Sequence, residues 1–228
     1  MVNDPLVTII IPMYNESATI GTLLGHLVQL QGNYEIIVID DASTDESQKI
    51  VKKFPSVKLV THGENLGKAD AIQSGLRISS GEIILIQDAD LEYPTTNIPR
   101  LIEPIVKNET SVVYGRRINV ESFLPVSLIA KFTTSQLVWL LFGKSVQDIN
   151  TGHKVFKRSC LDRLTLSSKG FSFCVEVTIK LIQGSICILE VPIDYYPRTK
   201  REGKKISIFD GFKIVKTIFS LKLQKNGK

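Results

Sequence analysis

Apolar, β-branched runs alternate with helical patterns four times along the first half of the chain. The runs span residues 6–11, 35–39, 57–61 and 82–86, and the helical patterns span residues 17–30, 45–54, 68–79 and 95–107. Parallel strands need a crossover, usually a helix, so this order predicts an α/β domain with a mostly parallel central sheet. The continuously apolar runs indicate strands buried on both faces. Ligands of such sheets bind beyond the carboxyl ends of the strands, where we look first for a site.

The composition fits one globular domain over residues 1–228. Apolar residues make up 43% and charged residues 22% of a chain long enough to bury a large core. The three cysteines show no CxxC spacing, and the amino terminus carries no basic segment. We therefore expect a cytoplasmic protein with neither a disulfide framework nor a zinc cluster.

The net charge of +5 is unevenly divided. Residues 1–150 hold 12 basic and 17 acidic side chains, whereas residues 151–228 hold 16 basic and 6 acidic ones. This division predicts an acidic part suited to a cation and a basic part suited to phosphate and anionic lipid. Nucleic acid, the partner that a basic protein first suggests, is not expected.

Carboxylates follow the predicted strands in place of phosphate-binding glycines. The first strand leads into Pro12 and Tyr14, and no GxxxxGK[ST] occurs in the chain. Asp88, Asp90 and Glu92 follow the fourth strand and would share one face if the segment stayed extended. Mg²⁺ or Mn²⁺ prefers such an oxygen-only ligand set and keeps other positions for substrate phosphates. We predict a divalent cation site here; the alternative is a solvated acidic loop that caps the next helix.

A doubled aspartate follows the second predicted strand. Asp40 or Asp41 could accept a hydrogen bond from a base or a ribose hydroxyl, while residues 43–45 cap the helix that follows. Tyr14 offers a flat ring for a nucleobase, and Pro12 fixes the backbone beside it. The alternative is that these residues only end a strand and cap a helix.

Four segments together carry a resemblance to a known family. They read IIIPMYNE at 9–16, VIDDASTD at 38–45, NLGKA at 65–69 and QDADLE at 87–92. In this combination the chain resembles family 2 glycosyltransferases with the GT-A fold, and most of all the polyprenyl-phosphate sugar transferases typified by dolichyl-phosphate mannose synthase. The resemblance implies a single Rossmann-like domain in which residues 1–118 bind the nucleotide-sugar and the metal, and residues 119–228 form the acceptor and membrane-interface half.

The same resemblance implies roles for individual residues of the first half. The cation is expected at Asp88, Asp90 and Glu92, although many relatives carry Gln at the position of Glu92. The residues expected to contact the donor nucleotide are Pro12, Tyr14, Glu16, Asp40, Asp41, Lys68, Asp88 and Ala89.

The second half contributes basic candidates and one acid. Arg117 ends a predicted strand at 112–117 and matches the family arginine, while the basic run at 198–205 carries the family's phosphate role on Arg198 and on Lys204 or Lys205. Asp148 matches an acidic position on the acceptor side, where a hydroxyl acceptor would need a general base. A phosphate acceptor has a second pKa of ~6 and needs no base near neutral pH, so Asp148 would orient partners or serve structure. The expected catalytic set is Asp90, Arg117, Asp148, Arg198, Lys204 and Lys205.

Two further polar residues of this half can be explained without a role in binding or catalysis. His153 has no visible metal partner, so we expect a polar loop residue rather than a ligand. Glu176 matches a recurrent acid of the family, but a place on a helix face explains it equally well.

Two apolar stretches of this half bear on membrane contact. Residues 123–143 are interrupted by Lys131 and several hydroxyl side chains, which favours the membrane interface over a span. In residues 208–225 an apolar face can form beside several lysines; its members are Phe209, Phe212, Val215, Ile218 and Phe219. Core packing is the alternative for both stretches. We expect carboxyl-terminal amphipathic helices at the cytoplasmic face of a membrane, with the protein peripheral to it.

These observations converge on a metal-dependent, inverting transfer of a hexose from a nucleotide-sugar to a polyprenyl (dolichyl) phosphate. Mannose from GDP-mannose is the first guess, with UDP-glucose and UDP-N-acetylglucosamine as alternative donors. A relative that uses a glycan hydroxyl as acceptor is the nearest rival. A non-catalytic module that binds anionic surfaces is a rival of another class, but it does not call for the acidic strand ends.

Overall fold

The computed structural model describes residues 5–118, 125–166, 172–198 and 208–225. Its described strands form one sheet in the order β3-β2-β1-β4-β6-β5-β7. All neighbours pair in parallel except β6, which is antiparallel to both β4 and β5. The strands are β1 (Val7–Met13), β2 (Tyr34–Asp40), β3 (Val57–Thr61), β4 (Ile83–Ile86), β5 (Val112–Arg117), β6 (Lys154–Lys157) and β7 (Leu189–Ile193).

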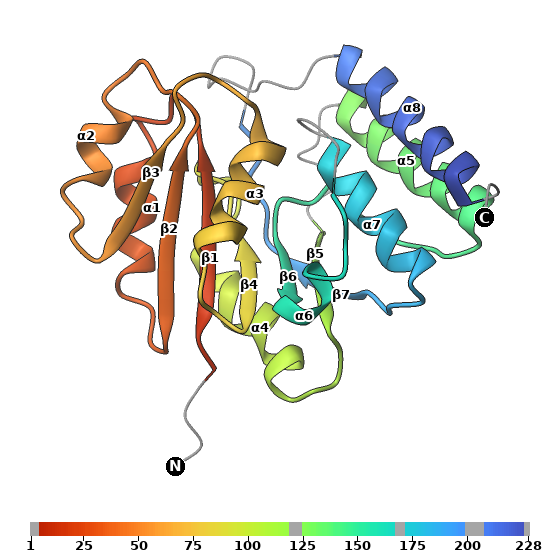
Figure 1. Ribbon diagram of the computed structural model, residues 1–228, viewed down its shortest axis with the longest axis horizontal. Helices are drawn as coiled ribbons and strands as arrows, with labels where there is room; N and C mark the ends of the chain where they lie inside the picture. The colour runs from red at the N-terminus through yellow and green to blue at the C-terminus, as the bar shows by residue number, and fades with distance from the viewer. Residues whose placement is uncertain (1–4, 119–124, 167–171, 199–207, 226–228) are drawn as a thin grey trace.

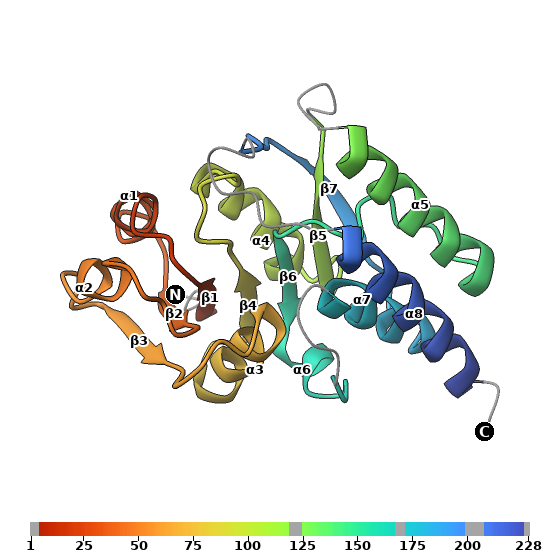
Figure 2. The ribbon, with the colours of Figure 1, turned by 90° about the horizontal axis from the view of Figure 1, so that it is seen from above.

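Helices cover both faces of this sheet (Figure 2). One face carries α1 (Ile20–Leu27), α2 (Ser47–Val51) and α4 (Ile98–Val106), and the other carries α3 (Lys68–Ile78), α6 (Arg158–Leu161) and α7 (Phe173–Gln183). Strand β1 shows how the sequence produces this sandwich, because Ile9 and Ile11 face the first helix layer and Ile10 faces the second. All three side chains are fully buried. The mostly parallel α/β sheet expected from the continuous apolar runs is confirmed.

The helices of the first two crossovers are shorter than expected, and residues before their amino-terminal ends form contacts between loops. Residues 17–30 contain only α1, and residues 45–54 contain only α2. Asp45 accepts hydrogen bonds from the backbone N–H groups of Ser17 at 3.0 Å and Ser47 at 3.0 Å. This carboxylate ties the loop after β1 to the loop after β2. Both loops therefore lie together at the carboxyl edge of the sheet.

Two long helices, α5 (Pro125–Phe142) and α8 (Ile208–Lys225), lie side by side (Figure 1). Helix α8 packs on α7 and α5 through buried Ile218 and Leu221, whereas Val215 and Phe219 are 43% and 48% exposed. Ile218 therefore packs in the core, whereas Val215 and Phe219 belong to an exposed apolar surface of the same helix. Among the residues described, we find no helix with the length and hydrophobicity needed to span a membrane.

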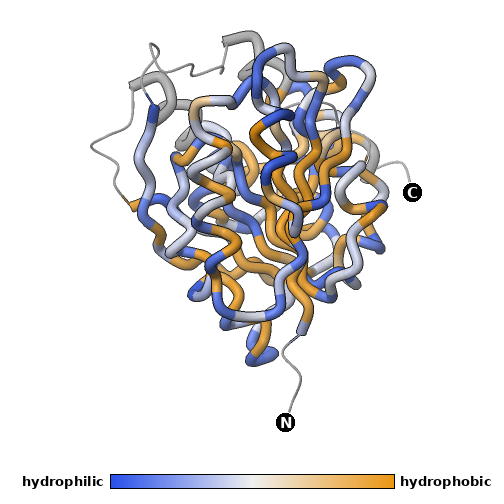
Figure 3. The backbone as a smooth tube through the Cα atoms, turned by 90° about the vertical axis from the view of Figure 1, so that its left-hand side faces the viewer, coloured by the Kyte–Doolittle hydropathy of each residue, from blue (hydrophilic) through white to orange (hydrophobic). Residues whose placement is uncertain are grey.

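Hydropathy follows the layers. Apolar strands run through the middle of the molecule, and hydrophilic loops gather at the edge opposite the amino terminus (Figure 3). This is the edge where β1, β2 and β4 end and where the acidic motifs begin. The fold therefore concentrates polar side chains at the position where α/β sheets bind ligands.

Candidate active site

The acidic segment after β4 forms a turn instead of continuing the strand. Leu91 has a φ of 60°, and Asp90 Oδ1 accepts a hydrogen bond from the Glu92 N–H at 3.1 Å. Gln87 supports the turn, because its Nε2 donates to two backbone carbonyls of the segment, one of them that of Asp88. We had expected the three carboxylates to share one face of an extended segment. They do not, and each carboxylate forms its own set of polar contacts.

Asp88 forms an ion pair with Lys68, the first residue of α3. Burial disfavours the charged carboxyl, but Lys68 outweighs this effect and keeps the pKa of Asp88 below its ordinary value. Gly67 precedes the lysine with a φ of 94°, a conformation that favours glycine. Gly152 provides the space for the carboxylate, since a Cβ there would lie 2.2 Å from Asp88 Oδ2.

Asp90 forms an ion pair with Arg198, which lies in the segment after β7. The guanidinium donates to Asp90 Oδ2 at 3.0 Å and to the two carboxylate oxygens of Glu16 at 2.9 and 3.3 Å. The backbone N–H of Arg198 donates to Glu92 Oε1 at 2.7 Å, and the Tyr195 hydroxyl donates to Glu92 Oε2 at 2.7 Å. Residues from β1, β4 and β7 loops are thereby joined at one point.

The donor chemistry of this point fits a divalent cation. Burial, and then the carboxylates of Asp88 and Glu92, raise the pKa of Asp90 to about 7, so a cation that binds there would favour the charged form of this carboxyl. Within the described ranges, no three His, Cys, Asp or Glu side chains form a complete metal cage. Mg²⁺ and Mn²⁺ need only one or two carboxylates when phosphate oxygens and water fill the remaining positions. Asp88 and Asp90 supply such a pair; both oxygens of Asp90, like those of Glu92, accept hydrogen bonds, so a cation at Asp90 would displace one of its donors.

Asp41 anchors the loop that leads to Lys68. It is buried, and its carboxylate accepts hydrogen bonds from the N–H groups of Leu66 at 2.9 Å and Gly67 at 2.7 Å. The ring of His62 lies 2.8 Å from the same carboxylate. The geometry therefore gives Asp41 a positioning role for this loop, in addition to the donor contact that the resemblance implies.

The other residues expected to contact the donor differ in how accessible they are. Asp40 is fully buried and accepts a hydrogen bond from Gln48 Nε2 at 2.7 Å, so its side chain holds α2 in place. Ala89 is also buried. Pro12 is the last residue but one of β1, and Tyr14, which follows the strand at the carboxyl edge, is partly exposed.

Arg117 and Asp148 form a buried, two-point ion pair. Asp148 is fully buried and accepts hydrogen bonds from Arg117 Nε at 2.8 Å, from its Nη2 at 2.7 Å and from its backbone N–H at 3.1 Å. Burial disfavours the guanidinium charge, but Tyr93 and Asp148 raise the pKa of Arg117 well above its ordinary value. The guanidinium also lies over the Tyr195 ring at 4.9 Å. An acid held in this way orients an arginine.

Polar groups beneath the acidic turn escaped the sequence analysis. Lys154 is buried, donates to the carbonyls of Ile149 and Thr151, and lies 4.5 Å from the centre of the Tyr114 ring. His153 lies in the loop just before β6, as we had expected of a loop residue, but its side chain is fully buried; burial lowers its pKa to about 3. A histidine just before a short strand and a lysine at its start give no sequence signal of burial.

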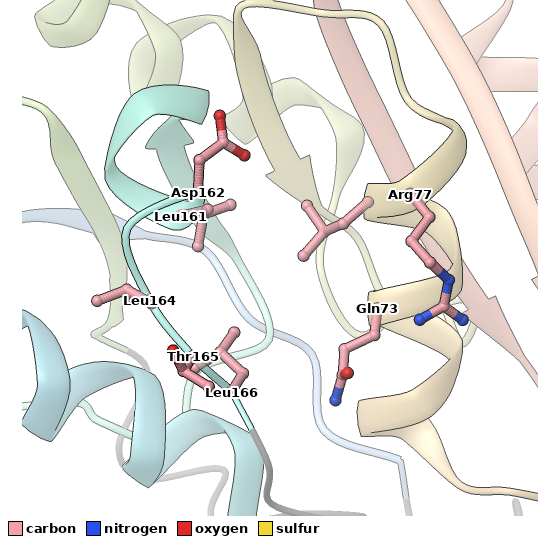
Figure 4. A pocket seen from close by; sticks show the side chains of 8 residues that line it. Gln73, Arg77, Leu161, Asp162, Leu164, Thr165 and Leu166 are labelled. Atoms are coloured by element: carbon pink, nitrogen blue, oxygen red, sulfur yellow. The ribbon is translucent and has the colours of Figure 1, made fainter.

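Three further candidates come from the second half of the chain. Lys204 and Lys205 fall outside the described residues. Glu176 is buried on α7, where it forms an ion pair with Lys180 at 2.7 Å, which agrees with its helix-face interpretation. A surface hollow between α3 and the segment after α6 is lined by Gln73, Arg77 and Asp162 among others (Figure 4). Its α3 residues follow Lys68 by five to nine positions, which is about 7–14 Å along the helix at 1.5 Å per residue.

The fold and the acidic edge define a class, the glycosyltransferases of the GT-A type. Glucosyl-3-phosphoglycerate synthase from Mycobacterium tuberculosis, solved with Mn²⁺, UDP and phosphoglyceric acid, is similar with a TM-score of 0.76 at 20% identity. The match covers 96% of this chain and 78% of that one. The model of the family "Glycosyl transferase family 2" matches residues 8–164, and the chain belongs to this family.

Curated relatives match most of the chain. Dolichol-phosphate mannosyltransferase of Pyrococcus furiosus is 31% identical over 212 residues, which cover 87% of this chain and 58% of the relative. UDP-N-acetylglucosamine–dolichyl-phosphate N-acetylglucosaminyltransferase of Methanococcus voltae is 29% identical over 248 residues, with 97% and 98% covered. The chain thus spans little more than half of the first relative and nearly all of the second.

Proposed function

We propose that this chain transfers a hexose from a nucleotide diphosphate sugar to a polyprenyl phosphate, in a metal-dependent reaction that inverts the anomeric carbon. The observation that carries the proposal is the pairing of Asp90 with Arg198 and of Asp88 with Lys68 at the carboxyl edge of the sheet, with Arg117 ending β5 of the same sheet. Carboxylates suit a cation, and guanidinium groups suit the phosphates of donor and acceptor. Several relatives named for polyprenyl- or dolichyl-phosphate transfer support this choice of acceptor.

The proposed roles follow from chemistry at each position. Asp88 and Asp90 would hold Mg²⁺ or Mn²⁺, which supplies charge neutralisation for the leaving diphosphate. Tyr14 and Glu16 would contact the nucleoside, and residues 1–118 would form the donor half. Arg117 would orient the acceptor phosphate with its guanidinium fixed by Asp148, and residues 119–228 would form the acceptor half. The acceptor is largely dianionic near neutral pH and attacks without losing a proton to the protein.

A glycan hydroxyl acceptor fits less well. It would need a general base near the anomeric carbon, and Asp148 is the acid that matches that position. Three donors of Arg117 already hold this buried carboxylate. The donor sugar is open among the relatives, so GDP-mannose, our first guess, is tested beside UDP-glucose and UDP-N-acetylglucosamine.

We further propose that the α5–α8 pair rests on the cytoplasmic surface of a membrane. Trp139 and Leu140 of α5 are 53% and 71% exposed, and Phe219 and Leu223 of α8 are 48% and 71% exposed beside exposed Lys216. Apolar side chains next to lysines favour an anionic lipid surface. Sedimentation with vesicles of anionic and of neutral lipid should show binding only to the former, and salt should weaken it.

The reaction is tested with the three donors, a polyprenyl phosphate and Mg²⁺ or Mn²⁺. We expect transfer from one donor, loss of transfer in excess chelator, and loss in Asp90→Asn, whose melting temperature added metal should no longer raise. Asp162→Asn is the matched control, because Asp162 is an exposed carboxylate of the hollow beside α6. Full transfer by Asp90→Asn or in chelator would refute the proposal.

A further inference from the structure

The guanidinium of Arg198 lies where positive charge is needed at the acidic edge. Its Nη2 donates to Asp90 Oδ2 at 3.0 Å, and Nη1 and Nη2 donate to the Glu16 carboxylate at 2.9 and 3.3 Å. The side chain is 18% exposed, and those of Glu16 and Asp90 are 10% and 16% exposed. Its Nε is buried without a hydrogen-bond partner. The geometry is that of an internal counter-ion held between two carboxylates.

A cation that binds Asp90 must contend with this guanidinium. Asp90 Oδ1 accepts the Glu92 N–H, and Asp90 Oδ2 accepts Arg198, so the carboxylate has no oxygen outside these contacts. A divalent ion at Asp90 would compete with Arg198 for one of these oxygens. If Arg198 stayed in place, the ion would lie within a few ångströms of a like charge. Like charges at such distances repel appreciably even at high dielectric constant. Arg198 therefore opposes metal binding when no donor is present.

We propose that Arg198 is a stand-in cation: it occupies the metal-binding carboxylate in the absence of donor and weakens the affinity of the site for the free metal ion. This inference rests on the proposed function, in which the same carboxylate holds the metal. A diphosphate that arrives with the metal offers the guanidinium a new partner, because planar arginine donors bind phosphate oxygens as well as carboxylates. The exchange would make metal and donor bind together, each raising the affinity for the other.

A stand-in cation and a purely structural residue predict opposite changes in metal affinity when Arg198 is replaced. If Arg198 only braces the carboxylates, removing it disorders the ligands and weakens metal binding. If it is a stand-in cation, removing its charge strengthens metal binding. Arg198→Gln keeps hydrogen-bonding capacity and removes the charge, whereas Arg198→Lys keeps the charge and removes the two-pronged geometry.

The test measures Mn²⁺ binding to the full chain by electron paramagnetic resonance, without nucleotide. We expect about tenfold tighter binding in Arg198→Gln, since one unit of like charge beside a divalent ion is removed at partly screened distance. Arg198→Lys should stay within about threefold of the wild type. The control is Arg77→Gln, which removes the same charge from an exposed residue of α3 and should leave Mn²⁺ affinity unchanged.

Thermal unfolding gives a second readout that needs no turnover. Metal-free Arg198→Gln should melt about 4 °C lower than the wild type, because Asp90 and Glu16 then repel each other without a counter-ion. Added Mn²⁺ should raise its melting temperature more than it raises that of the wild type, since tighter binding to the native state stabilises more. Equal or weaker Mn²⁺ binding by Arg198→Gln, with the wild type binding normally, would overturn the inference and leave the proposed function standing. Absence of Mn²⁺ binding in every form without nucleotide would overturn the inference alone, and absence of binding also with a nucleoside diphosphate present would overturn the proposed function as well.

Discussion

Asp148→Asn separates a positioning acid from a catalytic base. The substitution keeps the shape of the side chain and removes the charge that faces Arg117. The carboxylate is fully buried, and the arginine side chain is 12% exposed, so little solvent can replace the lost partner. Asparagine can still accept one hydrogen bond, but its amide nitrogen would face a guanidinium donor.

The expected loss of stability follows from this geometry. Breaking a buried ion pair from one side costs about 3–5 kcal/mol, because the remaining charge is left without compensation. The oxygen retained by asparagine places the effect near the lower limit, at about 3 kcal/mol. For a chain of this size that loss corresponds to a fall in melting temperature of about 6–12 °C. The exposed pair of Glu103 and Lys107 is the reference, and Glu103→Gln should change stability by less than about 0.5 kcal/mol.

Urea denaturation measures the free energy of unfolding of the wild type and both variants. A catalytic base would give the reverse pattern, namely full stability and a pH-rate profile that loses its acidic limb, because a base acts only when it is deprotonated. An Asp148→Asn variant that unfolds at the wild-type urea concentration would therefore refute the assignment of Asp148 as the partner of Arg117. Equal slopes against urea are required for this comparison, because a changed slope indicates a changed denatured or native state.

Two further predictions concern the layer beneath the acidic turn. Gly152→Ala should cost about 1–3 kcal/mol and most of the activity, since the new methyl group would displace the Asp88 carboxylate; Gly63→Ala, whose Cβ would meet open space, should preserve both in the same urea and transfer assays. Burial lowers the pKa of His153 to about 3. Below pH 6.5 the imidazole is therefore protonated in the unfolded chain but stays neutral in the folded protein. Stability should therefore fall by about 2 kcal/mol between pH 6.5 and pH 5. His153→Asn should abolish this part of the pH dependence, and an unchanged dependence would contradict it.

The first part of the fold could be predicted because its determinants are local. Strand β3 is found at residues 57–61 and β5 at residues 112–117, as the apolar runs indicated. Strand β6 was not predicted, because its four residues begin and end with lysine and carry no repeated pattern. Its burial comes from tertiary neighbours, with β4 and β5 pairing on either side. A pattern of four residues cannot express that environment.

The sequence predicts which types of side chain gather at the candidate site, but not how these side chains pair. Carboxylates after strands indicate a cation, and the motifs identify which carboxylates, but no local rule connects Asp90 with Arg198, which is 108 positions away along the chain. The extended-segment argument failed at Leu91, where a positive φ turns the chain and sends Glu92 toward Tyr195. Such contacts depend on the meeting of loops from β1, β4 and β7.

The uneven charge of the chain acquires a structural meaning from these contacts. Residues 1–150 are acidic and residues 151–228 are basic, and the ion pairs of Arg198 with Glu16 and Asp90 cross that division. An isolated amino-terminal half would expose clustered carboxylates without this counter-ion, as well as the apolar face of its sheet that α7 and α8 cover. The two proposed halves therefore complete one site and one core, and the same arginine that neutralises the acidic edge is available to the phosphate groups of a donor. Charge segregation along the sequence thus becomes charge complementarity at the carboxyl edge of the sheet.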